Sequence, residues 1–255
     1  MRAVVWGENL HEQRDQSVRR LYPEGMHNAI AVAIREHLGS TAVVTTATMD
    51  QEDNGLPEDL LSETDVLTWW GHIGHDKVSD DVVARVHQRV LRGMGLVVLH
   101  SAHYSKIFKS LMGTSCSLRW RDDGERELVW TVNPAHDIAQ GVPAVFEVPK
   151  QEMYGEYFDI PQPDELVFIS SFAGGELFRS GCCFYRGMGR VFYFSPGDQE
   201  FPVYHNEFVR RVLANAVRWA APRRGVAPEE YEAKEAKSGW LEEALQREPS
   251  RGSPR

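Results

Sequence analysis

The chain has 255 residues, of which 42% are hydrophobic and 25% charged, and its formal net charge is −9. This length and composition fit one sizeable globular α/β domain. An acidic balance without a basic cluster excludes a nucleic-acid partner, and no apolar run approaches the roughly 18–20 residues of a membrane span.

Strands and amphipathic helices alternate in the first half of the chain. The strand predicted over residues 3–6 follows the first methionine almost directly, without the apolar region of a signal peptide, so we expect a cytoplasmic protein. Apolar residues at helical spacing predict a helix over 23–39, and Ser79 caps a second helix over 79–93. Further strands are predicted over 41–48, 65–71 and 95–99. This order is typical of parallel strands joined by right-handed crossovers.

The second half is richer in strands. Strands are predicted over 128–132, 145–148, 166–172, 176–186 and 190–194, and an amphipathic helix over 204–221. We therefore expect one domain over residues 1–222 with a mixed sheet. Residues 223–255 are charged and poor in apolar side chains, which predicts a flexible tail with one weak helix.

Three cysteines, Cys116, Cys182 and Cys183, have no zinc-binding spacing. Cys182 and Cys183 are adjacent in a predicted strand and should point to opposite faces of the sheet. We expect all three to be free thiols.

Histidines and carboxylates follow three of the predicted parallel strands. Ligands of open α/β sheets bind at the carboxyl ends of the strands, so these side chains are candidates for a common site. They are Asn9, His11 and Glu12 after the first strand, His72 and His75 after the third, and His100 and His103 after the fourth. Neutral imidazoles ligate zinc, and imidazoles near their usual pKa exchange protons. For each one, a surface loop or a helix cap is the competing interpretation.

Two other kinds of site are not favoured. Ser101 lies where an α/β hydrolase exposes its nucleophile, but the glycines of the G-x-S-x-G turn are missing. The glycine-containing turns at 93–95 and 187–189 lack a phosphate-loop or dinucleotide pattern, so we expect no nucleotide cofactor.

Several blocks of the sequence, in this order, resemble the ThuA family of trehalose-utilisation proteins from about residue 2 to residue 222. They are DVLTWWGHIGHDKVSDDVVARVHQRVLRGMGLVVLHSAHYSKIFKSLMGT, QEMYGEYFDIP, GGELFRSGCCFYRGMGRVFYFSPG and YHNEFVRRVLANAVRWAAP. The resemblance implies a flavodoxin-like α/β fold of the class I glutamine amidotransferase type, a three-layer sandwich with a mostly parallel central sheet. It also implies a role in using trehalose or related disaccharides that a partner oxidoreductase has converted to the 3-keto form.

The resemblance also selects residues. The family's motif positions fall on His11, Glu12, Trp70, Gly71, His72, His100, His103, Glu152, Tyr154, Glu156, Tyr204 and His205. The chain departs from the family where members usually read Pro-Gly-His-Glu, because Asp198 stands for the histidine and Gln199 for the glutamate. A glutaminase activity does not follow from the implied fold, since no cysteine lies at the turn after residues 95–99.

We expect an enzyme that removes a proton next to the carbonyl of a keto-disaccharide, leading to isomerisation or elimination, with help from Zn²⁺ or another divalent ion. The expected catalytic residues are His100, His103, Glu152, Tyr154 and Glu156. The expected substrate-binding residues are His11, Glu12, Trp70, Asp198, Tyr204 and His205. The expected metal ligands are His72, His100 and His103.

Two alternatives remain open. One is a non-catalytic sugar-binding or regulatory protein in which Trp69, Trp70 and Tyr154 supply stacking faces. The other is a glycoside hydrolase with paired carboxylates. The expected partners are a small sugar substrate and, functionally, a sugar oxidoreductase, while the sequence leaves a homo-oligomer open.

Overall fold

A mixed sheet of nine strands organises the computed structural model, which describes residues 1–222 together with Gly239 and Leu245. Its spatial order is β2-β1-β3-β4-β9-β8-β7-β5-β6. The strands are β1 (Arg2–Gly7), β2 (Val43–Thr48), β3 (Val66–Trp70), β4 (Gly95–Leu99), β5 (Arg119–Thr131), β6 (Val145–Gly155), β7 (Glu165–Ser171), β8 (Leu177–Arg186) and β9 (Gly189–Phe194). The tail predicted over 223–255 lies, apart from two residues, outside the described part of the chain.

The sheet changes from parallel to antiparallel at β9. Strands β1 to β4 pair in parallel and β9 continues this direction beside β4, whereas β8, β7, β5 and β6 add antiparallel neighbours. The predicted mixed sheet in a flavodoxin-like, class I glutamine amidotransferase-like fold is confirmed, and its parallel pairings lie among β1 to β4 and β9.

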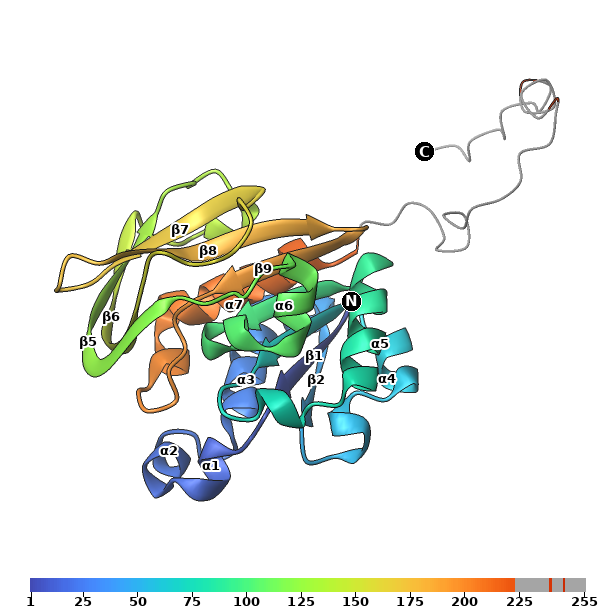
Figure 1. The fold of residues 1–255 in the computed structure, drawn as a ribbon, viewed down its shortest axis with the longest axis horizontal. Coiled ribbons are helices and arrows are strands. Elements are labelled where there is room, and N and C mark those ends of the chain that lie inside the picture. Colours follow the sequence, from blue (N-terminus) through green and yellow to red (C-terminus); the bar gives the residue numbers. More distant parts are fainter. Residues whose placement is uncertain (223–238, 240–244, 246–255) are drawn as a thin grey trace. The chain divides into compact units, whose positions relative to one another are not determined.

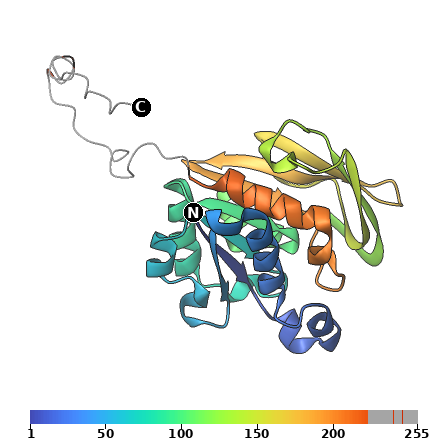
Figure 2. The same ribbon diagram turned by 180° about the vertical axis from the view of Figure 1, so that it is seen from behind.

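Helices cover both faces of the parallel half (Figures 1 and 2). Helices α3 (Met26–Leu38) and α7 (Glu207–Ala220) pack together on one face, and α4 (Glu58–Ser62), α5 (Asp80–Leu91) and α6 (Lys106–Met112) lie on the other. Two short helices, α1 (His11–Arg14) and α2 (Gln16–Leu21), follow β1. Strands buried on both faces need apolar side chains on both faces, which explains the continuous apolar runs of β3 and β4.

Two hydrophobic clusters lie on opposite sides of the sheet. One contains Cys183 and packs under α3 and α7, and the other contains Cys182 and packs under α5 and α6. The predicted opposite orientation of these two cysteines is confirmed, and all three cysteines are free and buried.

The antiparallel half departs most from the sequence prediction. Strands β5 and β6 are each longer than predicted, because residues 119–127 and 149–155 continue the ladder, with shifts in register on either side of Glu125. Charged residues dominate 119–127, so no alternation of apolar side chains signalled a strand there. As a result, Glu152 and Tyr154 lie on strand β6, where pairing with β5 fixes the position of their backbone.

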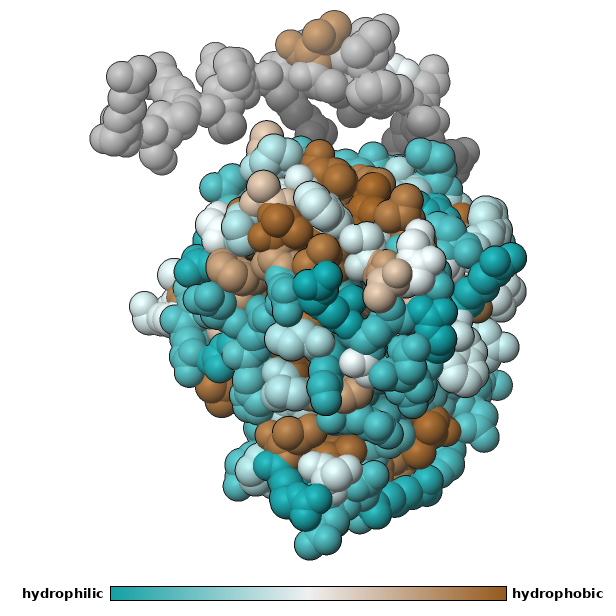
Figure 3. Space-filling view, turned by 90° about the vertical axis from the view of Figure 1, so that its left-hand side faces the viewer, coloured by the Kyte–Doolittle hydropathy of each residue, from teal (hydrophilic) through white to brown (hydrophobic). Residues whose placement is uncertain are grey.

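The face on the left-hand side of Figure 1 is largely hydrophilic, with hydrophobic side chains gathered in its upper part and a smaller group near its lower end (Figure 3). No helix within the described residues is long and apolar enough to cross a membrane.

Candidate functional site

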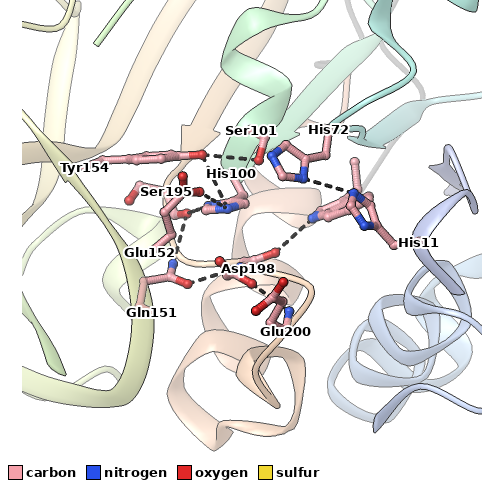
Figure 4. Close-up of polar contacts among 12 residues, drawn as sticks. His11, His72, His100, Ser101, Gln151, Glu152, Tyr154, Ser195, Asp198 and Glu200 are labelled. Atoms are coloured by element: carbon pink, nitrogen blue, oxygen red, sulfur yellow. Dashed lines mark hydrogen bonds and ion pairs between the residues drawn. The ribbon is translucent and has the colours of Figure 1, made fainter. Parts of the chain in front are cut away.

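Three histidines meet where β1, β3 and β4 end (Figure 4). His11 begins α1, His72 follows β3, and His100 follows β4. The Nδ1 atom of His72 lies 3.0 Å from Nε2 of His11, and the rings of His72 and His100 are 6.4 Å apart. The convergence expected from the carboxyl ends of parallel strands therefore occurs.

His100 occupies a sharp turn between β4 and the 3₁₀ helix over His100–Tyr104. Its φ of 51° lies in the left-handed region, which is unusual for a residue other than glycine. A turn of this kind between strand and helix exposes the nucleophile in α/β hydrolases. An imidazole therefore lies where a nucleophilic side chain would be. Cys116 is not a suitable nucleophile either, because it is buried and burial raises the pKa of its thiol.

Both ring nitrogens of His100 have defined partners. Nδ1 donates to the carbonyl oxygen of Ser195 at 2.8 Å, which leaves Nε2 facing Glu152 Oε2 at 3.1 Å. The ring stacks on Tyr154 with centroids 4.8 Å apart and an interplanar angle of 6°. Burial acts to lower the pKa of His100, but the hydrogen bond and charge of Glu152 outweigh it and the pKa is raised. Without a bound cation, the carboxylate therefore favours the protonated form of the imidazole.

Asp198 completes a group of potential metal ligands with His100 and Glu152. One ligand atom from each of the three buried residues lies within 4.8 Å of the others. The Asp198 backbone N–H donates to Gln151 Oε1, and its Oδ1 accepts from Glu200 N. Its other carboxylate oxygen accepts no hydrogen bond from the described residues 1–222. Burial raises the pKa of Asp198.

One imidazole nitrogen and two carboxylates are a donor set that zinc accepts. An Nδ1–H bonded to a carbonyl is the usual support of a ligating histidine, and His100 has it. The residues present therefore fit a divalent ion.

The geometry favours a different set of metal ligands from the predicted His72, His100 and His103. Only His100 belongs to the ligand group found among the described residues. His103 donates from Nδ1 to the carbonyl oxygen of Cys116 at 2.7 Å and packs against Tyr154, and His72 pairs with His11 instead.

A cavity of about 540 Å³ opens beside this group, within the range of small-molecule sites. It is lined by His72, His75, Ser101, His103, Tyr104, Ser117, Leu118, Trp120, Asp122, Glu152 and Tyr154. Burial lowers the pKa of His72, that of His75 to about 4 and that of His103 to about 3. These three imidazoles are therefore neutral near pH 7.

Tyr154 joins the cavity to His100. Its hydroxyl donates to Ser101 Oγ at 3.2 Å and lies 3.4 Å from His100 Nε2. Burial raises its pKa well above 10, so the hydroxyl stays protonated.

Two predicted residues lie away from the cavity. Glu156 accepts hydrogen bonds from the Arg179 side chain and from the backbone N–H of Phe158. Burial alone would raise its pKa, yet these hydrogen bonds lower it. His205 stacks on Tyr22 and its Nε2 meets the carbonyl oxygen of Leu21. Neither side chain lines the cavity beside His100.

Three predicted substrate-binding residues act instead within the protein interior. Glu12 accepts the backbone N–H of Met26 at the start of α3. Trp70 is 1% exposed and donates from Nε1 to the carbonyl oxygen of Gly197, and Tyr204 is fully buried. The Trp70 indole therefore holds the segment that carries Asp198, and because it is buried it offers no stacking face to a ligand.

Gly197 is required at the point where this segment passes the site. A Cβ atom there would come within 2.3 Å of the Tyr204 hydroxyl and 2.8 Å of His100 Cβ. Only a residue without a side chain allows Asp198 to approach His100 this closely.

Sequence reasoning missed two supporting residues. Glu8 is buried and accepts the backbone N–H groups of residues 72, 73 and 74, which fixes the loop that carries His72. Gln151 accepts from Asp198 N and donates to the Ser195 carbonyl. A polar residue directly after the first strand was the available signal for Glu8, whereas nothing in the sequence singled out Gln151.

Comparison with known proteins gives one family and several solved structures. The ThuA family, described as trehalose utilisation, matches residues 2–220. A putative ThuA-like protein from Bacteroides uniformis has 17% identity and a TM-score of 0.63, covering 86% of this chain and 91% of its own. No curated protein is significantly similar in sequence.

Two further structures share the fold. PurLQS from Thermotoga maritima has 12% identity and a TM-score of 0.52, covering 86% of this chain and 98% of its own. A cytoplasmic protein from Salmonella typhimurium has 14% identity and a TM-score of 0.54, covering 76% of this chain and 87% of its own. At these identities the likenesses concern the fold.

Proposed function

The chain belongs to the ThuA family of trehalose-utilisation proteins, and on this premise we propose that it is a metal-assisted enzyme acting on 3-keto-disaccharides derived from trehalose or a related sugar. The reaction proposed is removal of a proton from the carbon next to the ketone, followed by isomerisation or elimination. The observation that carries this proposal is the group of His100, Glu152 and Asp198 beside a cavity that Glu152 and neutral histidines line.

His100, Glu152 and Asp198 would hold a divalent ion, with zinc the best match to the donor set. When bound, the ion supplies positive charge that polarises a ketone oxygen and acidifies the neighbouring C–H bond. The hydrogen bond from His100 Nδ1 to Ser195 keeps Nε2 directed toward the carboxylates. The hydrogen bond from Asp198 N to Gln151 keeps that carboxylate in place.

His72 is the base in this proposal. It is neutral because burial lowers its pKa, and its ring lies between His11 and His100 at the cavity wall. A proton accepted by His72 is stabilised by the neighbouring carboxylates, since Glu152 and Glu8 both act to raise its pKa. The protonated hydroxyl of Tyr154 can donate to the oxygen that gains charge if it turns away from Ser101 Oγ.

The substrate of such a reaction must first be oxidised. We propose that a sugar oxidoreductase supplies the ketone and that both proteins act in the cytoplasm. The fold shared with the cytoplasmic Salmonella protein supports this location.

Exchange of the proton for deuterium tests the central step directly. A 3-keto-disaccharide incubated with the protein in D₂O should gain deuterium at a carbon next to the ketone, as followed by NMR. The metal content of the purified protein should be measured in parallel, and a chelator should abolish exchange.

Glu152→Gln and Asp198→Asn keep the shape of each side chain but remove its charge. We expect exchange to fall by about 10² or more, the usual scale for a lost acid, base or ligand. Glu147→Gln is the matched control, because Glu147 lies on the same strand with about half of its side chain exposed. Sugar binding by the wild type without any exchange would contradict the enzyme proposal and favour the non-catalytic alternative.

A further inference from the structure

Trp120 is an exposed aromatic side chain at the wall of the cavity. It is 66% exposed, whereas Trp6, Trp69, Trp70 and Trp219 are at most 5% exposed. An indole left in water at a cavity wall is typical of a surface that packs against a ligand.

Trp120 lies on β5, apart from the potential metal ligands His100, Glu152 and Asp198. Trp120 pairs with Tyr154 across the β5–β6 ladder, so both side chains stand on the same face. Asp122, two residues further along β5, also lines the cavity. The cavity thus has an inner part formed by Glu152, Tyr154 and His72, and an outer part with Trp120 and Asp122.

Tyr104 is the other exposed aromatic residue of the outer part, at 48% exposure. The Nζ atom of Lys109 lies 3.0 Å from the centre of its ring and covers one of its faces. Trp120 therefore offers the larger open aromatic surface.

We propose that the outer part of the cavity is a subsite for the second ring of a two-ring carbohydrate, with Trp120 as its stacking surface and Asp122 as its hydroxyl acceptor. A pyranose has an apolar C–H face, which packs on indole, and an edge of hydroxyl groups, which donate to a carboxylate. The first ring reaches Glu152 and Tyr154. This inference rests on the proposed function, because it takes the ligand to be a sugar.

Turnover of two substrates tests the subsite. Trp120→Ala should raise KM for a 3-keto-disaccharide at least tenfold and leave KM for the corresponding 3-keto-monosaccharide within about twofold. Trp120→Phe should restore most of the lost affinity, and Asp122→Asn should show a smaller, substrate-dependent loss. Trp130→Ala is the matched control, because Trp130 lies on the same strand, is 44% exposed and does not line the cavity. Equal effects on both sugars, or none, would overturn the assignment.

Binding measured by calorimetry separates this inference from the proposed reaction. The unoxidised disaccharide and monosaccharide are titrated into wild type and Trp120→Ala, so no turnover is needed. We expect the wild type to prefer the disaccharide by tenfold or more and the variant to lose that preference. No preference in the wild type would overturn the subsite. A dimer that is lost only in Trp120→Ala would assign the indole to a subunit contact and overturn it as well. Absence of deuterium exchange, by contrast, counts only against the proposed reaction.

Discussion

Replacing His103 by Asn should make the protein less sensitive to acid. The imidazole is 8% exposed, and its Nδ1 donates to the carbonyl oxygen of Cys116. An asparagine amide can occupy the place of Nδ1 and keep that hydrogen bond, but it cannot take up a proton. The variant will lose ring contacts with Tyr154 and Phe158, and this cost does not depend on pH.

The magnitude follows from the difference in proton uptake between the folded and unfolded states. Burial lowers the pKa of His103 from 6.5 to about 3 in the folded protein. A lowered folded pKa contributes stability that is present above pH 6.5 and is lost as the pH falls toward 3. Between pH 7.5 and pH 5.0 the unfolded chain takes up most of one proton and the folded chain takes up almost none. This single group therefore removes about 2 kcal/mol from the free energy of unfolding of the wild type.

Urea unfolding followed by tryptophan fluorescence at both pH values measures this quantity for wild type and His103→Asn. The wild type should lose about 2 kcal/mol more than the variant between pH 7.5 and 5.0, with similar m-values. Equal losses in the two proteins would show that His103 is protonated in the folded state, and the argument for a neutral histidine in the cavity would be wrong.

Three further outcomes are expected. Burial raises the pKa of Glu127 to about 7. The contribution of this group to the free energy of unfolding is therefore present below pH 4.5 and is lost as the pH rises through 7. Relative to the wild type, Glu127→Gln should be about 2–3 kcal/mol more stable at pH 8 than at pH 5 in the same urea assay. A Cβ at Gly95 would lie 2.3 Å from the carbonyl oxygen of Ala220. Gly95→Ala should therefore lower Tm and reduce the free energy of unfolding by about 1–3 kcal/mol. An unchanged Tm would show that α7 can move to make room. His205→Gln should keep sugar turnover within about twofold, because His205 contacts Leu21 and Tyr22 away from the cavity. A large loss of turnover would instead support the predicted role of His205 in substrate binding.

The parallel half of the fold was predictable from the sequence. Strands β3 and β4 are continuous apolar runs because both of their faces are covered, and such runs between helical patterns leave little choice of architecture. Residues 119–127 were not predictable as strand. Their side chains are mostly charged and exposed, and their pairing with β6 follows from backbone hydrogen bonds that leave no apolar pattern.

The site was predictable only in part, because the sequence pattern indicates where strands end but not which side chains meet. Strand ends bring His11, His72 and His100 together, and this placement follows from topology alone. Which nitrogen faces which carboxylate depends on side-chain contacts between distant segments, such as His100 with Ser195 and Asp198 with Gln151. Sequence spacing holds no information on those contacts. The metal set was therefore predicted with His72 and His103, whereas the potential ligands grouped around His100 in the structure are Glu152 and Asp198.

The switch from parallel to antiparallel pairing at β9 also has a consequence for folding. His100 comes from the parallel half and Glu152 from the antiparallel half, and the Ser195 carbonyl that orients His100 lies 95 residues further along the chain. Contacts this distant in sequence form late, because a long loop must close before they are made. An intermediate with only β1–β4 and their helices assembled would carry the histidines without the carboxylates. Recovery of the site should therefore coincide with the slowest refolding phase, which makes ligand binding a sensitive reporter of complete folding.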